Sequence, residues 1–412
     1  MTPPIVIIGA GGAGIIAAWK ASACGASVII LERNGRAGTK ILISGGGKCN
    51  ITHAGTRDDV LRAFIPAEAR FLKPAMHRFT NDDIVKLLND KGISTETREN
   101  GRVFPMYGMA KDVMRVLNGL LDHERIRVRH HTRVNGIQAV DGAVTGVLCD
   151  DGVIPASQVI LATGGSSYPK TGTTGDGYRW AASLGHTVVP PRAALAPIQV
   201  QPALPRAWQG ISFRDCRLSA VQNGKRLAAW DGDVLFTHEG LSGPCALEIS
   251  RAAAAAQEKA PVSIVADLFP GHEFEHLDHE LGRVVQEHRQ RAIGTVLDAW
   301  LPNRLVDAFL GGIDVDPQTR GHVLTRDARR AIVRRLKEWP LGRVAHVPIE
   351  RGEVTAGGIA LNEVDPRTMR SRIVKGLYPC GEVLDIAGPI GGYNLQAAFS
   401  TGYVAGETAA LD

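Results

Sequence analysis

The chain has few aromatic residues, few cysteines and no long apolar run. Aromatic residues make up 5% of its 412 residues, and its six cysteines are scattered without a CxxC pair. The lack of such a pair argues against zinc ligation and a redox disulfide, so we expect no metal site and a reduced, cytoplasmic compartment. No run of eighteen or more apolar residues is present to span a membrane, so we expect no membrane partner.

The charge balance is also mild. The net charge of +5 comes from 47 basic and 42 acidic residues, which weakly favours anionic small ligands. The most basic stretch, Arg326 to Lys337, carries an apolar stripe and no interleaved aromatic residues, and we interpret it as a surface helix. We therefore expect a small-molecule substrate and no nucleic-acid partner, and we leave a homo-oligomer open.

The N-terminal stretch "IVIIGAGGAGIIAAWKASACGASVIILERN" contains the strongest pattern. Ile5 to Ile8 is typical of a buried parallel strand, a helix is predicted for Ile15 to Cys24, and Val28 to Leu31 is a second buried strand. The G-x-G-x-x-G between the first strand and the helix allows a tight turn, close approach of a pyrophosphate and close helix–strand packing. The pyrophosphate would lie at the helix N-terminus, where free N–H groups favour negative charge.

An acid completes this motif. Glu32 follows the second strand directly, eighteen residues after Gly14. A carboxylate there can accept hydrogen bonds from ribose hydroxyls, so the whole unit predicts a dinucleotide-binding domain.

Two further segments indicate which dinucleotide is bound. Arg133 to Gly165 is predicted to form a β-meander that returns to the sheet through a buried strand and the sequence ATGG. Near the C-terminus a short strand, Leu377 to Pro379, precedes Gly381-Glu382, and a helix is predicted from about Tyr393 to Ala410. The arrangement resembles the two-dinucleotide-fold flavoproteins, which include glutathione reductase and fumarate reductase, and this resemblance implies FAD.

Three longer segments resemble one family in particular. They are "KILISGGGKCNIT", "SYPKTGTTGDGYRWAASLGHTVVPPRAALAPI" and "VTAGGIALNEVDPRTM…GLYPCGEVLDIAGPIGGYNLQAAFSTGYVAG". They are similar to the bacterial HI0933-like flavoproteins, which are also described as aminoacetone oxidase-like or bile-acid-reductase-like NAD(P)/FAD-dependent oxidoreductases. "ENGRVFP" and "LFTHEGLSGP" fit the same pattern, so the resemblance covers nearly the whole chain.

The glycine triplet Gly45 to Gly47 is then interpreted as cofactor geometry. Backbone without a Cβ could lie against the ribityl chain or ring system of FAD. Lys40 and Lys48 could neutralise its negative charge. Cys49 has no nearby second cysteine, so we expect a packing role there and not thiol chemistry.

The predicted FAD-binding residues come from all of these segments. They are Gly9, Gly11, Gly12, Ala13, Gly14, Glu32, Arg33, Lys40, Ser44, Gly45, Gly46, Gly47, Cys49, Asn50, Val134, Ala162, Thr163, Gly164, Gly381, Glu382, Asp385, Gly391, Gly392, Tyr393, Asn394 and Leu395.

The predicted fold class is α/β, with an FAD-binding Rossmann-like domain interrupted by an inserted β-rich domain that carries a helical subdomain. We assign residues 1–191 and 352–412 to the FAD-binding domain, 192–275 and 338–351 to the β-rich domain, and 276–337 to the helical subdomain. Short strands are expected at 216–221, 225–229, 233–236 and 262–267, with Asn223-Gly224 as a hairpin turn, and helices at 276–300 and 326–339.

Four residues are candidates for catalysis. Arg102 could orient an anionic or carbonyl substrate through its fixed bidentate donors, and Tyr168 could donate a proton. Tyr393 could stack or donate at the flavin, and His238 lies among small residues in "THEGLSGP". For His238 a structural, hydrogen-bonded role is the alternative.

These observations predict an FAD-dependent oxidoreductase that transfers hydride through the flavin. Only one G-x-G-x-x-G is present, so NAD(P)H would act as a transient donor for the reduction of a small enone-like substrate. The alternatives are a flavin-dependent oxidase of an amine or alcohol, a tRNA-modifying flavoenzyme and a flavoprotein without turnover.

Overall fold

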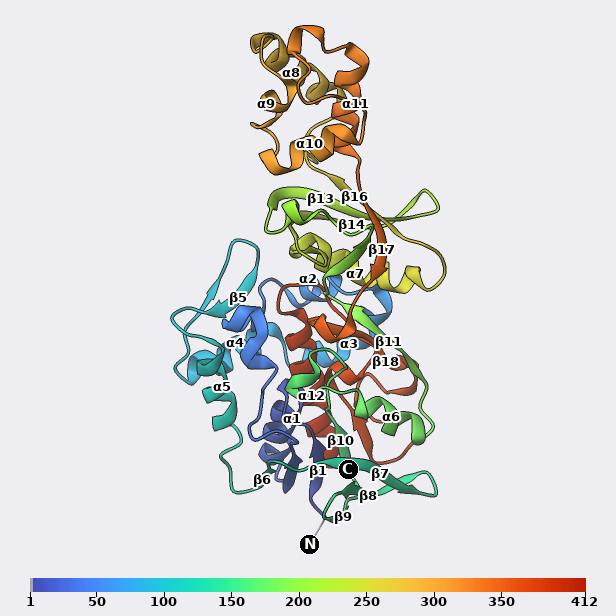
Figure 1. Ribbon diagram of the computed structural model, residues 1–412. Helices are drawn as coiled ribbons and strands as arrows, with labels where there is room; N and C mark the ends of the chain where they lie inside the picture. Colours follow the sequence, from blue (N-terminus) through green and yellow to red (C-terminus); the bar gives the residue numbers. More distant parts are fainter. Residues whose placement is uncertain (1–2) are drawn as a thin grey trace. The chain divides into compact units, whose positions relative to one another are not determined.

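The computed structural model describes residues 3–412 and divides into two compact units (Figure 1). Unit 1 comprises residues 3–192 and 349–412, and unit 2 comprises residues 193–348.

Unit 1 is built on a five-stranded parallel sheet. Its strands run in the order β19 (Leu377–Pro379), β10 (Val159–Leu161), β1 (Ile5–Ile8), β2 (Val28–Leu31) and β6 (Ile126–Arg129). The central strands are apolar and buried, as expected for strands covered on both faces. The carboxyl ends of these strands meet at one edge of the sheet, where open α/β sheets bind their ligands.

Two helices pack side by side against this sheet, α1 (Gly12–Ala23) and α12 (Tyr393–Leu411) (Figure 1). A Cβ on Gly402 would lie 2.3 Å from the Ala13 carbonyl oxygen, and one on Gly406 would lie 2.1 Å from that of Ala17. Because both contacts advance by four residues in the same direction, the helices are parallel. They pack with backbone against backbone.

This register sets the offset, along the helix axes, between the two helix N-termini. Gly12, the first residue of α1, is level with Thr401 of α12, and eight residues of α12 precede that level. At about 1.5 Å per residue, α12 therefore begins about 12 Å beyond the start of α1, with its dipole in the same direction.

The remaining elements of unit 1 surround this core. Its other helices are α2 (Arg57–Arg62), α3 (Pro66–Arg78), α4 (Asn81–Asp90), α5 (Ala110–Gly119) and α6 (Asp176–Ser183). Its other strands form the sheets β3 (Thr52–His53)–β5 (Arg102–Pro105)–β4 (Thr95–Thr97) and β7 (Val134–Val140)–β8 (Ala143–Cys149)–β9 (Gly152–Pro155), and the pair β11 (Val188–Ala194)–β18 (Val354–Ile359).

Unit 2 contains a closed six-stranded barrel. The strand order is β12 (Ile198–Gln201), β15 (Gly240–Ser242), β14 (Lys225–Phe236), β13 (Ser212–Gln222), β16 (Ser263–Asp267) and β17 (Trp339–His346). Helix α7 (Pro244–Gln257) packs on β13 and β14. A buried aromatic cluster includes Trp339 of β17, which is 1% exposed, and Trp208, whose ring centroid lies 5.3 Å from that of Trp339.

Four helices follow β16 and precede β17 in the chain, and they form one group (Figure 1): α8 (Phe274–Glu287), α9 (Ile293–Leu297), α10 (Asn303–Gly311) and α11 (Arg326–Lys337).

Two local predictions for unit 2 were wrong. Residues 225–236 form one strand and not two, because pairing with β13 continues through Gly232. The helix predicted for 276–300 is two helices, because the chain turns after Glu287.

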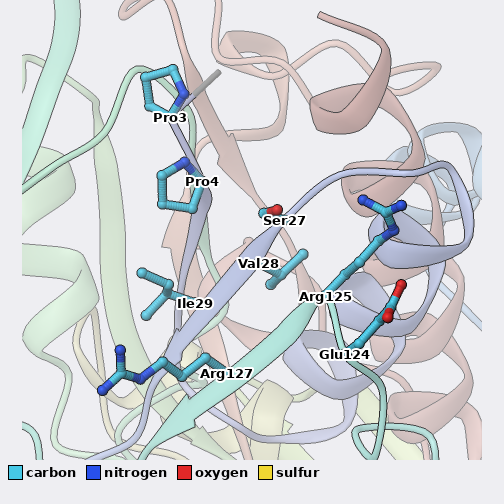
Figure 2. Close-up of a pocket in the computed structure, with 8 residues that line it drawn as sticks. All are labelled: Pro3, Pro4, Ser27, Val28, Ile29, Glu124, Arg125 and Arg127. Atoms are coloured by element: carbon cyan, nitrogen blue, oxygen red, sulfur yellow. The ribbon is translucent and has the colours of Figure 1, made fainter. Parts of the chain in front are cut away.

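Two further features concern the surface. No helix among residues 3–412 is both long and apolar enough to cross a membrane. A hollow of about 440 Å³ is lined by Pro3, Pro4, Ser27, Glu124, Arg125 and Arg127, among others (Figure 2). It lies at the amino ends of β1, β2 and β6, opposite the edge where parallel sheets bind cofactors, so we do not assign the functional site to it.

The close packing of α1 and α12 leads to a test. Gly406→Ala would force the added methyl group against the Ala17 carbonyl oxygen, and overpacking of this kind costs about 1–3 kcal/mol of unfolding free energy. We expect a lower midpoint of thermal unfolding, followed by circular dichroism. The control is Gly119→Ala, at the exposed end of α5 where nothing lies within 4 Å, which should keep or slightly raise the midpoint. Equal midpoints for the two variants would contradict the described packing.

Candidate functional site

The glycine-rich turn after β1 forms one end of the candidate site. A Cβ on Gly14 would lie 2.0 Å from the Gly9 carbonyl oxygen, so only glycine allows the helix to start this close to the strand. A Cβ on Gly11 would meet nothing within 4 Å. Gly11 caps α1 without a side-chain hydrogen bond, and the first turn contains no acid. The first N–H groups of α1 are therefore available to an anion.

Glu32 fixes this turn from the neighbouring strand. Its side chain is 7% exposed, and its carboxylate accepts hydrogen bonds from the backbone N–H groups of Ala10 and Asn34, both at 2.8 Å. The carboxylate is thus held beside the glycine-rich turn. The Arg33 side chain donates to Asp176, the first residue of α6, at 3.1 Å and to Thr174 Oγ1 at 2.6 Å, so it anchors the loop before α6.

The glycine triplet forms the second part of the site. The backbone N–H of Gly38 donates to the Ala10 carbonyl at 2.8 Å, which brings the segment after Glu32 back to the glycine-rich turn. The triplet then has φ values of +56°, +66° and +84°, and a Cβ on Gly46 would meet nothing within 4 Å. Three successive left-handed residues require glycine, and they leave bare backbone at this surface.

The N-terminus of α12 forms the third part. Its cap is Gly392, with no side-chain cap and no acid in the first turn. The Asn50 side-chain oxygen accepts from the Gly392 N–H at 3.0 Å in the amide orientation that satisfies its neighbours. The Asn394 side chain closes the preceding loop by accepting from the Gly388 N–H at 2.8 Å.

The other α-helices of unit 1 each carry an acid in the first turn. Both α2 and α4 begin with capping boxes, formed by Thr56 with Asp59 and by Thr80 with Asp83. Among the α-helices described in unit 1, α1 and α12 alone have neither a side-chain cap nor an acid in the first turn, so their N-termini are open to another group. Two positive helix ends offset by about 12 Å along the helix axes, with an acid and bare glycine backbone beside them, fit an extended, negatively charged dinucleotide.

A polar network links the loops at the carboxyl edge of the sheet. Lys40 Nζ donates to both carboxylate oxygens of Glu382, at 2.8 and 3.0 Å, and to Ser167 Oγ at 2.6 Å. The backbone N–H of Thr355 donates to Glu382 Oε1 at 2.9 Å, and Thr355 Oγ1 accepts from the Ser166 N–H at 2.8 Å. The network therefore joins the loop after β2 to β18 and to the loops after β10 and β19.

Lys40 is thus held by a carboxylate, and its predicted contact with a cofactor stays a prediction. Lys48, the second lysine considered for that role, is exposed. Asp385 accepts from the Gly357 N–H at 3.0 Å, which ties the loop after β19 to β18.

Several predicted cofactor residues lie at the carboxyl edge of the sheet. The Ala162 N–H donates to the Ile8 carbonyl at 3.0 Å, and Val134 starts β7 with 8% of its surface exposed. Thr163 Oγ1 is a buried hydroxyl oxygen that has no hydrogen-bond partner within residues 3–412. It lies against Gly177, where a Cβ would approach it to 2.1 Å, so Thr163 packs against α6.

Of the four catalytic candidates, three lie in unit 1. Tyr393 stacks on His53 with ring centroids 4.7 Å apart, and His53 is in register with Arg102 across β3 and β5. Tyr168 precedes a short 3-10 turn and has φ +50°. His238 belongs to unit 2, where it is exposed and lies 3.5 Å from Glu239.

Glu353 was not among the predicted site residues, and the structure brings it near Arg102 and Lys40. Desolvation raises the pKa of its carboxyl group, although Lys40 and Arg102 act to lower it. The side chain keeps exposed surface while neighbouring protein atoms desolvate it. It directly precedes the buried "VTAGGI" strand, and an acid at such a boundary was the available signal.

The cysteines are mostly inaccessible. Burial raises the pKa of the Cys49 thiol to about 11, although a hydrogen bond with Ser44 acts to lower this pKa. The scattered Cys216 and Cys245 meet in unit 2, where Cys245 Sγ donates to the Cys216 carbonyl at 3.4 Å, and both are fully buried. Only Cys24 among the six is not buried.

One group of side chains in unit 2 could hold a metal ion. His272, just before α8, and His276 and Glu280 within α8 bring their ligand atoms within 4.8 Å of one another. All three lie at the surface, and the two histidines are exposed. The predicted lack of a metal site stays a prediction.

Comparison with known proteins gives the chain its relatives. The family model described as HI0933-like protein Rossmann domain matches residues 3–408. The ribosomal RNA dihydrouridine synthase of Haemophilus influenzae is 31% identical over 404 residues, which are 97% of this chain and 96% of that protein. The 3-dehydro-bile acid delta(4,6)-reductase of Clostridium scindens is 30% identical over 410 residues, 98% of each chain.

Among solved structures, the chain is similar to 3-ketosteroid delta1-dehydrogenase from Sterolibacterium denitrificans. The TM-score is 0.53 at 13% identity, and the match covers 100% of this chain and 99% of that one. At this identity the likeness concerns the fold alone, and the predicted α/β fold class is confirmed.

The thiol environments predict a labelling pattern. Because the thiolate is the reactive form and needs access, a thiol reagent at pH 8 should modify Cys24 in the native protein and spare Cys49. All six cysteines should react after unfolding. Mass spectrometry of peptides locates the labels, and Cys24→Ser is the control that should abolish native labelling. Rapid native labelling of Cys49 would show that its burial is wrong.

Proposed function

The chain belongs to the HI0933-like family, and we propose that it is an FAD-dependent oxidoreductase in which NAD(P)H reduces a carbon–carbon double bond conjugated to a carbonyl group. We propose a small organic, enone-like molecule as the substrate.

The observation that carries this proposal is the pair of uncapped, parallel helix N-termini. The start of α1 would bind the pyrophosphate, and the start of α12 would lie at the ring system, about 12 Å further along the helix axes. Glu32 would accept from a ribose hydroxyl, and Gly45 to Gly47 would pass beside the ribityl chain. The positive end of α12 would favour negative charge on the ring system.

FAD bound in this position would supply the hydride acceptor and donor for the reaction. The protein would supply orientation and charge. The Lys40–Glu382 ion pair would keep the loops after β2, β10 and β19 in fixed positions around the cofactor. Asn50 would hold the first residue of α12 against the glycine triplet.

The class of bond comes from the relatives. The name of the C. scindens relative describes a reductase of a 3-oxo steroid acid with double bonds at positions 4 and 6. Dihydrouridine, in the name of the H. influenzae relative, is uridine with its C5–C6 double bond saturated, and that bond is conjugated to the C4 carbonyl. Both names therefore describe saturation of the same kind of bond, which flavin hydride can reduce.

A second candidate substrate is the uracil ring of ribosomal RNA, favoured by the identity to the H. influenzae relative along nearly the whole chain. Three basic side chains of α11 give it little support, because each is paired with an acid. Arg329 is bidentate to Asp278 at 2.9 and 3.0 Å, Arg330 binds Glu275, and Lys337 binds Asp267 at 2.7 Å. These three positive charges are paired with acids of unit 2 and are not free to bind RNA phosphates. We therefore place the small enone first.

An anaerobic titration tests the proposal. The purified protein should show an oxidised flavin spectrum that bleaches stoichiometrically with NADH or NADPH. 2-Cyclohexen-1-one should then restore the oxidised spectrum, because the bond to be reduced is conjugated to its carbonyl group. Stopped-flow absorbance measures both half-reactions, and protein without added donor is the control.

The other outcomes are distinct. Restoration by ribosomal RNA alone, with dihydrouridine detected by mass spectrometry of nucleosides, would support the second candidate. A flavin that resists both donors would contradict the reductase and favour an oxidase or a protein without turnover. A protein that binds no flavin, even after FAD is added, would overturn the whole proposal.

A further inference from the structure

Three polar side chains of unit 1 lack hydrogen-bond and ion-pair partners, although electrostatic interactions connect them. Within residues 3–412, the Glu353 carboxylate, the Arg102 guanidinium and the Tyr168 hydroxyl form no hydrogen bond or ion pair. The positive charges of Arg102 and Lys40 both act on the Glu353 carboxyl group, and the charge of Glu353 acts on Tyr168. Charged and polar groups that lie near each other without pairing are typical of a site that binds a ligand.

The backbone holds this group in place. The Tyr168 N–H donates to the Glu350 carbonyl at 3.3 Å, and Ser167 Oγ donates to the Glu353 carbonyl at 3.4 Å. Ser167 is also bonded to Lys40, so the segment with Glu353 is tied to the Lys40–Glu382 network. Tyr168 adopts the left-handed conformation, with φ +50° and ψ +60°. This conformation strains the backbone of a non-glycine residue.

The same group is connected to the start of α12. Arg102 is in register with His53 across β5 and β3, and His53 stacks on Tyr393, the first residue of that helix. The group therefore lies between the two features that we assign to the flavin end of the cofactor, the Lys40–Glu382 network and the α12 N-terminus.

We propose that Glu353 is the acid that protonates the substrate carbon next to the carbonyl group, while Arg102 and Tyr168 hold the carbonyl oxygen. The inference rests on the proposed function and adds the residues that complete it. Fixed guanidinium donors and a tyrosine hydroxyl suit an oxygen that gains negative charge. The raised pKa values of Glu353 and Tyr168 keep both groups protonated to higher pH than is usual for them.

The step balances as follows. The hydride, with two electrons, forms a C–H bond at the β-carbon, the π bond breaks, and the electron pair moves to the carbonyl oxygen as an enolate. The enolate then forms a C–H bond at the α-carbon with the proton of the Glu353 carboxyl group, whose O–H bond breaks. NAD(P)H is the reductant, and water reprotonates Glu353, whose side chain keeps exposed surface.

The experiment uses the reverse of the proton step, which needs no net redox change. Oxidised, FAD-loaded protein without NAD(P)H is incubated with cyclohexanone in D₂O, and NMR follows replacement of the α-protons by deuterium. Glu353→Gln should slow this exchange about 10²-fold or more, the usual contribution of a positioned acid or base. The same variant should slow reoxidation of the NAD(P)H-reduced protein by 2-cyclohexen-1-one to a similar extent, with unchanged reduction by NAD(P)H.

The matched control is Glu350→Gln, which removes the same charge three residues away from an exposed side chain and should behave as wild type. Circular dichroism and flavin content show whether each variant is folded. If Glu353→Gln does not fold, Glu353→Asp replaces it. The shorter carboxylic acid should retain part of the exchange, and full wild-type exchange would then contradict the assignment.

The outcomes separate the two proposals. Wild-type exchange rates in Glu353→Gln, or no exchange above the solvent rate in the wild type, would overturn the role of Glu353. Exchange that depends on Glu353 in a protein that neither donor can reduce would support the role of Glu353 and contradict the NAD(P)H-linked reductase.

Discussion

The packing of α1 against α12 is the contact on which the rest of unit 1 depends. Gly402 and Gly406 place the two backbones against each other, and the four-residue step of both contacts makes the helices parallel. Because parallel helices have parallel dipoles, both positive ends are directed to the carboxyl edge of the sheet. The register then offsets them by about 12 Å along the helix axes, since α12 begins eight residues before the level of Gly12. A loop could not hold two such ends at a fixed separation.

The polar network gives this edge of the sheet its rigidity. Lys40, Glu382, Ser167 and Thr355 come from four separate segments, and their hydrogen bonds join the loops that follow β2, β10 and β19 to β18. A charged pair that is only partly exposed is stabilised by further hydrogen bonds, and here the Thr355 N–H and the Ser167 hydroxyl supply them. Ser167 of this network directly precedes Tyr168 in the chain. The network therefore connects the cofactor region with the unpaired group formed by Glu353, Arg102 and Tyr168.

The sequence predicted the parts of this site that depend on local pattern. The β1 strand, the glycine-rich turn and Glu32 follow each other within about thirty residues, and each has a recognisable physical reason. Unit 2 was harder, because a barrel depends on long-range pairing: β12 and β17 are neighbours although their sequences lie far apart. Glu353 could not be assigned from sequence, because its significance comes from Lys40, Arg102 and Tyr168, which lie far away in the chain.

The central claim is that one FAD molecule engages both helix N-termini at once. Hydrogen–deuterium exchange of the apoprotein, measured as FAD is added, tests it most directly, because the first-turn N–H groups of α1 and α12 have no intrahelical acceptors. The account predicts that peptides covering Gly9–Gly14 and Gly391–Leu395 become protected together, at the same FAD concentration. Protection of the α1 turn alone would contradict it, since the start of α12 would then have no part in holding the cofactor.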